Sequence, residues 1–382
     1  MQKNYDAVIV GSGLAGATSA RRFADAGRSV LLLERRDHVG GNAYDCLDDA
    51  GVLIHKYGPH IFHTNSRRVF DFLCRFGSFS DYAHKVGARV GDKLIPVPFN
   101  LNSIDAVFGE RAEGLRKKLL DRYAPEQKIP VFELTEQDDP ELAELAEYVY
   151  ENVFKYYTQK QWGVPLEKVS RETLSRVPVF LSRDDRYFQD TYQGMPVEGY
   201  TALIANMLDH PLIETVVSVD ARERLTLDGE RILLDGEEFF GQVIYSGPAD
   251  ELFDNKYGAL PYRTLDFKFE THNVDQYQPY GTVNYTVSED YTRITEFKIL
   301  TEQELPGVTT IMKEYSRAYE GGDDIPYYAI LDPENLALYE KYAAEANKSG
   351  RFHLLGRLAE YRYYNMDATV EKALALCDEL LK

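Results

Sequence analysis

Two short apolar runs mark the first elements of the chain. Residues 5–10 (YDAVIV) and 29–34 (SVLLLE) lack the alternation of a half-buried strand, and such runs are typical of strands buried on both faces of a parallel sheet. Residues 14–26, between them, have the composition of a helix. We therefore predict a βαβ unit at the start of the chain.

Helical periodicity returns in two later stretches, 103–124 and 140–161. The second has a clear start signal, because Asp139 can cap the helix and Pro140 occupies its first position. Its apolar side chains then recur every three or four residues, at Leu142, Leu145, Ala146, Val149, Val153 and Tyr157. We predict a helical insert over roughly 101–162.

Alternation of apolar and polar positions marks residues 216–246 and 262–300. The pairs Asp228-Gly229 and Asp235-Gly236 are hairpin turn signals in the first stretch. Both stretches therefore predict antiparallel strands. In 291–297 the alternation would place a row of side chains on one face, where they could line a site: Tyr291, Arg293, Thr295 and Phe297.

Two more helices are predicted, at 334–347 and at 367–381, the second with Asp367 as its cap. The fold class is α/β, with a Rossmann-like domain, a helical insert domain and an antiparallel sheet domain that are discontinuous in sequence. The expected boundaries are 1–80, 195–250 and 345–382 for the Rossmann-like domain, 100–165 for the helical domain, and 81–99, 166–194 and 251–344 for the sheet domain.

Charge narrows the choice of partners. The 382 residues carry a formal net charge of −19. This argues against nucleic acid and against anionic membranes, because both need a basic face. An anionic substrate would need a local group of arginines.

The cysteines point to a reducing compartment. Cys46, Cys74 and Cys377 have neither a metal-binding nor a CxxC spacing, so we expect free thiols and no metal site. The chain runs directly into a strand, and we expect no signal peptide or membrane span. The prediction is a cytoplasmic protein.

A glycine motif lies between the first strand and the first helix. Gly11, Gly13 and Gly16 have the spacing of the dinucleotide fingerprint in its required context. Such glycines allow a tight turn and let backbone N–H groups reach a pyrophosphate at the positive end of the helix. Glu34, at the end of the second strand, can accept a hydrogen bond from a ribose hydroxyl.

The next stretch, ERRDHVGGNAYD (34–45), favours FAD over NAD. Its Gly40-Gly41 pair resembles the second glycine turn that many FAD proteins carry after their first βαβ unit, although an ordinary turn remains an alternative. No second GxGxxG follows, so the sequence offers no separate NADPH-binding domain.

Five further stretches, in this order, carry a resemblance to a known family: YGPHIFHTN (57–65), YTQKQWG (157–163), DDRYFQDTYQGMPVEGYT (184–201), YTRITEFK (291–298) and GRLAEYRYYNMD (356–367). Along nearly the whole chain they resemble the bacterial UDP-galactopyranose mutases. The resemblance implies a cytoplasmic isomerase of cell wall polysaccharide biosynthesis, a flavoprotein that interconverts UDP-galactopyranose and UDP-galactofuranose. It also implies a homodimer or higher homo-oligomer.

The same resemblance implies a mechanism. FAD would be bound non-covalently and would be active only when reduced. Flavin N5 would attack the anomeric carbon as UDP leaves, and the sugar would open as an iminium. The 4-hydroxyl would then reclose a five-membered ring, with no net redox change.

Residue roles follow from the matched motifs. Catalytic roles fall to Arg176 and Arg293, which would meet the diphosphate, and to His60 and His63, near the isoalloxazine. Substrate contacts are implied at Tyr157, Trp162, Tyr187, Phe188, Asn284, Tyr328, Tyr363, His84 and Arg263. Cofactor contacts are expected at Gly11, Gly13, Leu14, Ala15, Gly16, Glu34, Arg35, Arg36, Gly41, Asn42, His60, Arg357, Tyr364, Asn365, Met366 and Asp367. The family also implies a flap over the substrate within 164–193.

Four departures from the family pattern leave the sugar open: Met312, Ile299, Ala329 and Phe180. If they line the pocket, they alter its shape, so a mutase for a deoxy or N-acetyl nucleotide hexose is an alternative. A redox FAD oxidase and a binding protein without catalysis are the other classes. The arginine pair argues for the mutase, because guanidinium groups suit a departing diphosphate.

Overall fold

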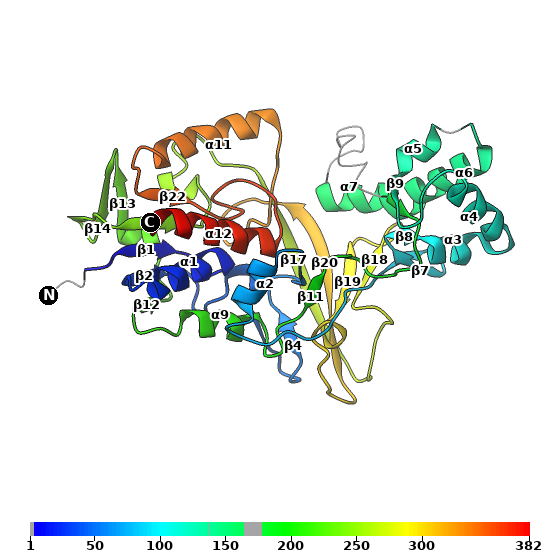
Figure 1. Cartoon of the computed structure of the whole chain (residues 1–382), viewed down its shortest axis with the longest axis horizontal. Helices are drawn as coiled ribbons and strands as arrows, with labels where there is room; N and C mark the ends of the chain where they lie inside the picture. The colour runs from blue at the N-terminus through cyan, green and yellow to red at the C-terminus, as the bar shows by residue number, and fades with distance from the viewer. Residues whose placement is uncertain (1–3, 137, 164–177) are drawn as a thin grey trace.

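A five-stranded parallel sheet forms one end of the molecule (Figure 1). The computed structural model describes residues 4–136, 138–163 and 178–382. The strand order is β12 (Ile213–Val216), β2 (Val30–Leu33), β1 (Ala7–Val10), β16 (Gln242–Tyr245) and β22 (Phe352–Leu354), and every neighbouring pair is parallel. All residues of β1 and β2 are buried, as their continuous apolar runs predict.

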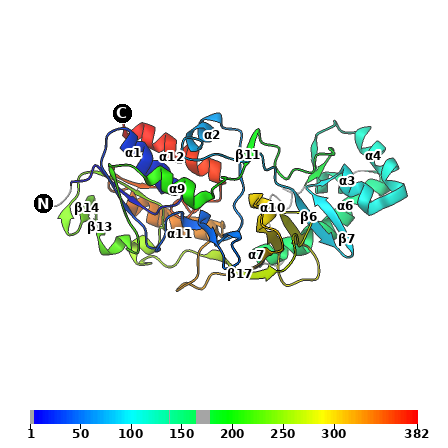
Figure 2. The ribbon, with the colours of Figure 1, turned by 90° about the horizontal axis from the view of Figure 1, so that it is seen from below.

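The two faces of this sheet are covered differently. Ala7, Ile9 and Leu32 pack in a core with the helices α1 (Leu14–Asp25), α9 (Tyr200–Leu208) and α12 (Met366–Leu380), which Figure 2 shows grouped together. The alternate residues face a small meander of β13 (Leu225–Asp228), β14 (Arg231–Leu234) and β15 (Glu237–Glu238). Both Asp-Gly turn predictions are confirmed, because the strands reverse at these positions.

A seven-stranded sheet forms the middle of the molecule. Its order is β21 (Tyr328–Ala329), β17 (Tyr262–His272), β20 (Thr309–Ala318), β19 (Arg293–Glu296), β18 (Thr282–Tyr285), β6 (Val86–Val90) and β7 (Lys93–Val97). Neighbours are antiparallel as predicted, except that β18 and β6 pair in parallel. The chain leaves this sheet at α10 (Phe297–Thr301), where a strand was expected to continue.

The helical domain lies at the opposite end from the parallel sheet (Figure 1). It holds α3 (Leu101–Phe108), α4 (Ala112–Leu120), α5 (Val131–Thr135), α6 (Pro140–Val149) and α7 (Tyr156–Trp162), with the short strands β8 (Phe99–Asn100), β9 (Lys128–Pro130) and β10 (Pro178–Phe180). The helical stretch expected over 103–124 forms two helices, α3 and α4. Gly109 adopts a φ of 55°, and the helix breaks there.

Helix termini follow the predicted chemistry in one case and not in another. The Asp139 carboxylate accepts a hydrogen bond from the Glu141 amide at 3.1 Å, so the predicted cap of α6 is confirmed. The predicted cap of the last helix is wrong. Asn365 precedes α12, and Asp367 lies in its first turn, where it accepts from the Ala368 amide at 2.7 Å.

The remaining elements connect the three parts: α2 (Arg67–Leu73), α11 (Pro333–Ala346), β3 (Asp45–Leu47), β4 (Leu53–His55), β5 (Phe62–Thr64) and β11 (Tyr192–Gly194). β10 contributes Val179 to the helical core, and α11 contacts β22. The exact domain boundaries stay a prediction. In the described part of the chain, no helix combines the length and apolar character needed to cross a membrane.

Candidate active site

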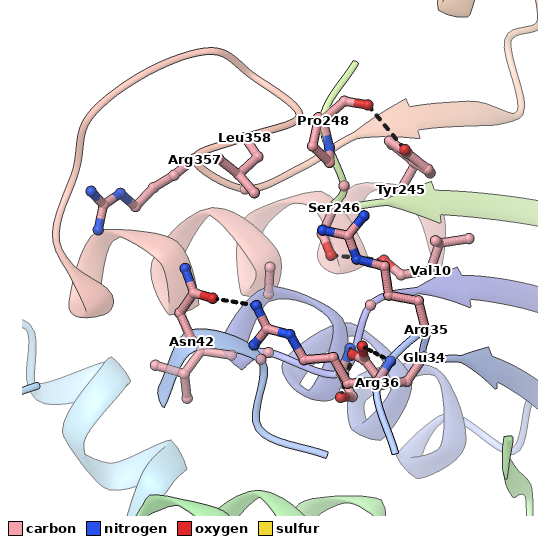
Figure 3. Close-up of a pocket in the computed structure, with 18 of the residues that line it drawn as sticks. Val10, Glu34, Arg35, Arg36, Asn42, Tyr245, Ser246, Pro248, Arg357 and Leu358 are labelled. Atoms are coloured by element: carbon pink, nitrogen blue, oxygen red, sulfur yellow. Dashed lines mark hydrogen bonds between the residues drawn. The ribbon is translucent and has the colours of Figure 1, made fainter. Parts of the chain in front are cut away.

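A cavity lies at the carboxyl ends of β1, β2 and β16 (Figure 3), and we call it the glycine-loop cavity. Of the expected cofactor residues it is lined by Gly11, Gly13, Leu14, Ala15, Glu34, Arg35, Arg36, Gly41, Asn42, His60, Arg357 and Met366. Carboxyl ends of parallel strands are where open α/β sheets bind their ligands.

Four expected cofactor residues do not line this cavity. A Cβ on Gly16 would lie 1.9 Å from the Gly11 carbonyl oxygen. Only a glycine therefore fits at this position, where the first helix packs closely against the glycine loop. Tyr364 donates its hydroxyl hydrogen bond to Glu360 instead. Asn365 lines a neighbouring cavity, and Asp367 accepts a hydrogen bond from the Ala368 amide within the first turn of its own helix.

Sequence reasoning missed part of the cavity wall. Residues 219–222, 245–248 and 356 contribute to it, as does Tyr327. A signal was present in the Ser-Gly-Pro that follows β16, because a third parallel strand ends there at the same edge as the glycine loop. Ser246 donates to the Val10 carbonyl oxygen at 2.7 Å and ties the two strand ends together (Figure 3).

Glu34 holds the glycine loop in shape. Its Oε2 accepts hydrogen bonds from the Ser12 amide at 2.8 Å and from the Ser12 hydroxyl at 2.6 Å, and its Oε1 accepts from the Arg36 amide at 3.0 Å. The carboxylate still lies on the cavity wall. It can therefore bind a ribose hydroxyl with lone pairs that these contacts leave free.

The cavity fits a dinucleotide cofactor. Arg36 donates from Nη2 to Asn42 at 2.8 Å (Figure 3). Its guanidinium lies 4.1 Å from the centre of the Tyr57 ring. Its Nη1 is buried without a hydrogen-bond partner among the described residues, so a fixed cationic donor remains for a pyrophosphate. A Cβ on Gly41 would lie 2.9 Å from Cα of Gly13, and one on Gly11 only 2.2 Å from Oγ of Ser246.

A second cavity adjoins the first, and we call it the sheet cavity. The two share Asn42, His60, Tyr327, Arg357 and Met366. The sheet cavity brings together most of the expected substrate and catalytic residues, namely His60, His63, His84, Tyr157, Tyr187, Phe188, Asn284, Arg293, Tyr328 and Tyr363. These positions are far apart in sequence and meet because the seven-stranded sheet and α7 enclose one space.

Arg293 is the fixed cation of the sheet cavity. Register places it opposite Asn284 on β18 and opposite Glu314 on β20. Its Nε and Nη2 donate to Oε2 of Glu314 at 2.9 and 2.7 Å, and the Glu314 side chain is fully buried. Burial by itself would lower the pKa of Arg293, but the charge of Glu314 outweighs burial and raises it. The guanidinium therefore stays charged and oriented.

Two histidines of the sheet cavity are neutral. Burial lowers the pKa of His60 and of His84 to about 3. The His60 ring bonds the Gly58 carbonyl oxygen at 2.8 Å, and the His84 ring contacts the Tyr82 hydroxyl at 2.9 Å. Both rings can exchange hydrogen bonds with a ligand without adding charge.

His63 has a different environment. Its Nδ1 lies 2.7 Å from Oδ2 of Asp190, and its ring stacks on Phe188 with centroids 3.6 Å apart. Asp190 was not singled out from the sequence. The carboxylate fixes the orientation of the ring.

Two tyrosine rings lie against an arginine where the two cavities meet. The Arg357 guanidinium lies 4.6 Å from the Tyr363 ring centre and 5.4 Å from that of Tyr328. Burial raises the pKa of Tyr328 to about 12, and burial also raises that of Tyr157. These hydroxyls keep their protons and can act as donors.

Some of the residues singled out from the sequence lie away from both cavities. Arg263 does not line either cavity. It donates to Ser316 at 3.0 Å and packs against Gly163 at the end of α7. Of the row predicted in 291–297, only Arg293 lines the sheet cavity, and Phe297 packs in the core at the start of α10.

The four departures from the family pattern also lie elsewhere. Met312, Ile299, Ala329 and Phe180 line neither cavity, so they do not form part of either cavity wall. Arg176, the side chain of Trp162 and the 164–177 part of the expected flap lie outside the described residues.

Comparison with known proteins shows which family this chain resembles. Residues 152–363 match the UDP-galactopyranose mutase family, and residues 9–76 match the NAD(P)-binding Rossmann-like domain. The crystal structure of a reduced UDP-galactopyranose mutase covers 100% of this chain and 94% of its own, with a TM-score of 0.69 and 17% identity. That likeness confirms the predicted fold class.

Two curated relatives extend over nearly the whole chain. A probable UDP-galactopyranose mutase from Klebsiella pneumoniae is 37% identical over 99% of this chain and 95% of its own. A dTDP-fucopyranose mutase from Escherichia coli is 34% identical over 98% of both chains. The resemblance and the isomerase class predicted from the sequence are thereby confirmed, and the chain belongs to the UDP-galactopyranose mutase family.

Proposed function

We propose that this protein interconverts UDP-galactopyranose and UDP-galactofuranose with reduced, non-covalently bound FAD. The observation that carries the proposal is the arrangement of two joined cavities. One fits a dinucleotide, and the other holds a charged arginine oriented by a buried carboxylate. Reduced flavin would supply a nucleophile, its N5 atom, for the anomeric carbon, so the ring could open and reclose without net redox.

The glycine-loop cavity would hold FAD through side chains with separate tasks. Glu34 would accept from a ribose hydroxyl, while Arg36 would donate from its free Nη1 to the pyrophosphate. Arg357 and His60 lie where the cavities meet, so they would contact the flavin ring and the sugar together. His60 would do so as a neutral group, because its pKa is about 3.

The sheet cavity would hold the nucleotide sugar. Arg293, together with Arg176, would bind the diphosphate and stabilise it as it leaves. Tyr328 and Tyr363 would donate to the same phosphates without adding charge. The rings of Tyr157, Trp162, Tyr187 and Phe188 would flank the uridine, with Asn284 as a polar contact. His63 and His84 would complete the wall.

Chromatography of the products tests this proposal. The purified protein is checked for flavin absorbance and incubated with UDP-galactofuranose, with and without dithionite, under nitrogen. We expect UDP-galactopyranose only in the reduced sample. In separate samples without dithionite, either in air or with added NADPH, consumption of oxygen or NADPH without isomerisation would instead identify a redox enzyme. A flavin-loaded protein that converts no nucleotide furanose would be a binding protein.

A second candidate is a mutase for a 6-deoxyhexose carried on dTDP. It is favoured by the dTDP-fucopyranose mutase, which matches this chain over as much of its length as the UDP-galactopyranose mutases do. The same assay with dTDP-fucofuranose distinguishes the two by kcat/KM. A cytoplasmic location and a homodimer or higher homo-oligomer stay predictions, and light scattering after size-exclusion chromatography tests the oligomer.

A further inference from the structure

Two buried threonines lie opposite each other on the seven-stranded sheet. Thr282 of β18 is directly opposite Thr295 of β19. Their exposed fractions are 2% and 0%, and neither Oγ1 has a hydrogen-bond partner among the described residues. Buried hydroxyls without a partner are rare in native proteins, because each loses its hydrogen bonds to water on folding.

Other threonines of this sheet are satisfied. Thr271 and Thr310 also face each other, on β17 and β20, and their hydroxyls lie 3.1 Å apart. Thr309 donates to Glu296 at 2.8 Å, and Thr292 donates to the Glu314 carbonyl oxygen at 3.1 Å. Facing threonines in this sheet can therefore bond. Thr282 differs from all of these because it lines the sheet cavity.

The position of Thr282 relative to Arg293 follows from strand register. Thr282 is two residues from Asn284 on the same face of β18, which separates their side chains by about 7 Å. Asn284 is opposite Arg293, so Thr282 lies about 7 Å from the arginine's row of the sheet. That separation is comparable to the length of a hexose ring.

Thr282 lines the sheet cavity together with Arg293 and His60. The row of the sheet that contains Arg293 continues through Glu314 to Phe267, whose ring lies 5.8 Å from the ring of Tyr327, where the two cavities meet. Thr282 lies one row away from that path, on the wall of the same cavity.

We propose that Thr282 is a specificity-determining residue whose hydroxyl hydrogen-bonds one sugar hydroxyl of the nucleotide hexose. The proposal rests on the proposed function. The ring contraction uses C1, the ring oxygen and the 4-hydroxyl, so the hydroxyls at C2, C3 and C6 remain free for recognition. A site with a buried hydroxyl that needs a partner disfavours an analogue that lacks that partner.

The test combines variants with substrate analogues. Thr282→Val removes the hydroxyl at nearly constant volume, Thr282→Ser keeps it, and Thr271→Val removes the bonded threonine that lies away from the cavity. For each reduced holoenzyme, kcat/KM is measured with UDP-galactopyranose and with its 2-deoxy, 3-deoxy and 6-deoxy analogues. Flavin content and melting temperature are recorded for every protein.

One analogue should reveal the contact. We expect Thr282→Val to lower kcat/KM for UDP-galactopyranose about tenfold. With the analogue that lacks the contacted hydroxyl, wild type and Thr282→Val should be equal, because the interaction is absent in both. Thr282→Ser and Thr271→Val should stay within about twofold of wild type on every substrate. The melting temperature of ligand-free Thr282→Val should not fall, because an unsatisfied hydroxyl is removed.

Other results would overturn the proposal. An equal loss on all four substrates would assign Thr282 a packing role. No loss on any substrate would mean that water satisfies the hydroxyl. If Thr282→Val does not retain flavin, Thr282→Ala is measured with the same four substrates. A loss on every substrate except one analogue supports the proposal, and an equal loss on all four overturns it. If wild type converts none of the four substrates, the proposed function fails and this inference fails with it.

Discussion

The two joined cavities are built in different ways. The glycine-loop cavity takes most of its shape from backbone, and its carboxylate, Glu34, is satisfied by the loop itself. The sheet cavity takes its shape from side chains on different strands, and its cation, Arg293, is held by Glu314 from a neighbouring strand. The first kind of site depends on local conformation, and the second depends on sheet register and buried charge. Variants should therefore affect them separately.

The largest expected effect on cofactor binding comes from a change in the backbone-built cavity. Gly41→Ala should lower flavin affinity about a hundredfold, because the new Cβ would push against Cα of Gly13 at 2.9 Å and displace the loop. Flavin absorbance after dialysis measures the loss.

Gly27→Ala is the matched control. Gly27 also has a positive φ, of 76°, but a Cβ there would meet nothing within 4 Å. Both variants should lose about 1 kcal/mol of stability through backbone strain, while only Gly41→Ala loses flavin. Equal flavin loss in both would show that strain, and not the contact with Gly13, is responsible.

The next effect is on the side-chain cavity. Arg293→Met should lower kcat about a thousandfold and leave flavin content unchanged, because the diphosphate loses its oriented cation. Arg317→Met, which removes an arginine paired with Asp266 and Asp324, should leave kcat unchanged. Turnover per bound flavin is the measurement. Loss of flavin from Arg293→Met would show that this arginine supports flavin binding, and that its assignment to the diphosphate in the sheet cavity is wrong.

A smaller effect is expected on stability. Glu314→Gln should lower the free energy of unfolding by about 2 kcal/mol, less than for a fully buried pair because the Arg293 side chain is 24% exposed. Urea unfolding measures it.

The double variant Arg293→Met, Glu314→Gln sharpens this result. It should be more stable than the sum of the two single changes predicts, because no buried charge is left alone. It should nevertheless stay inactive. Additive losses would show that the two side chains do not act as a pair.

The two cavities were predicted from different kinds of sequence signal. Gly11, Gly13 and Glu34 lie within one βαβ unit, so spacing along the chain is enough to place them. The residues of the sheet cavity followed only from the resemblance to a family, and the positions that lie away from it, Arg263 and Phe297, depended on where a strand begins or ends and which face it presents. Glu314 was missed for a similar reason, since only strand register shows that it faces Arg293. Long-range register leaves little trace in one sequence.

A further expected effect is the dependence of stability on pH. Burial lowers the pKa of His55 to about 4 and that of His60 and His84 to about 3. Unfolded histidine titrates near 6.5, so the unfolded chain takes up protons first as pH falls. The stabilisation from each neutral histidine is complete above pH 6.5 and is lost as pH falls from there towards 4 and 3.

Urea unfolding between pH 7 and pH 5 checks this sign. Stability should fall with pH, with a slope of up to about 1.4 kcal/mol per pH unit for each buried histidine. In His84→Gln the slope of stability against pH should be smaller, because one histidine no longer takes up a proton on unfolding. An unchanged slope in that variant would mean that His84 is already protonated in the folded protein.

The central claim is that FAD and the nucleotide sugar bind in separate cavities. Its most direct test is a binding experiment with UDP and FAD together. UDP is titrated into the FAD-loaded protein by calorimetry, and released flavin is measured in the filtrate of each sample. The account predicts one UDP per chain with all flavin retained, and binding that is weakened in Arg293→Met. Release of flavin in proportion to UDP bound would show that both ligands use one cavity, and the account would be wrong.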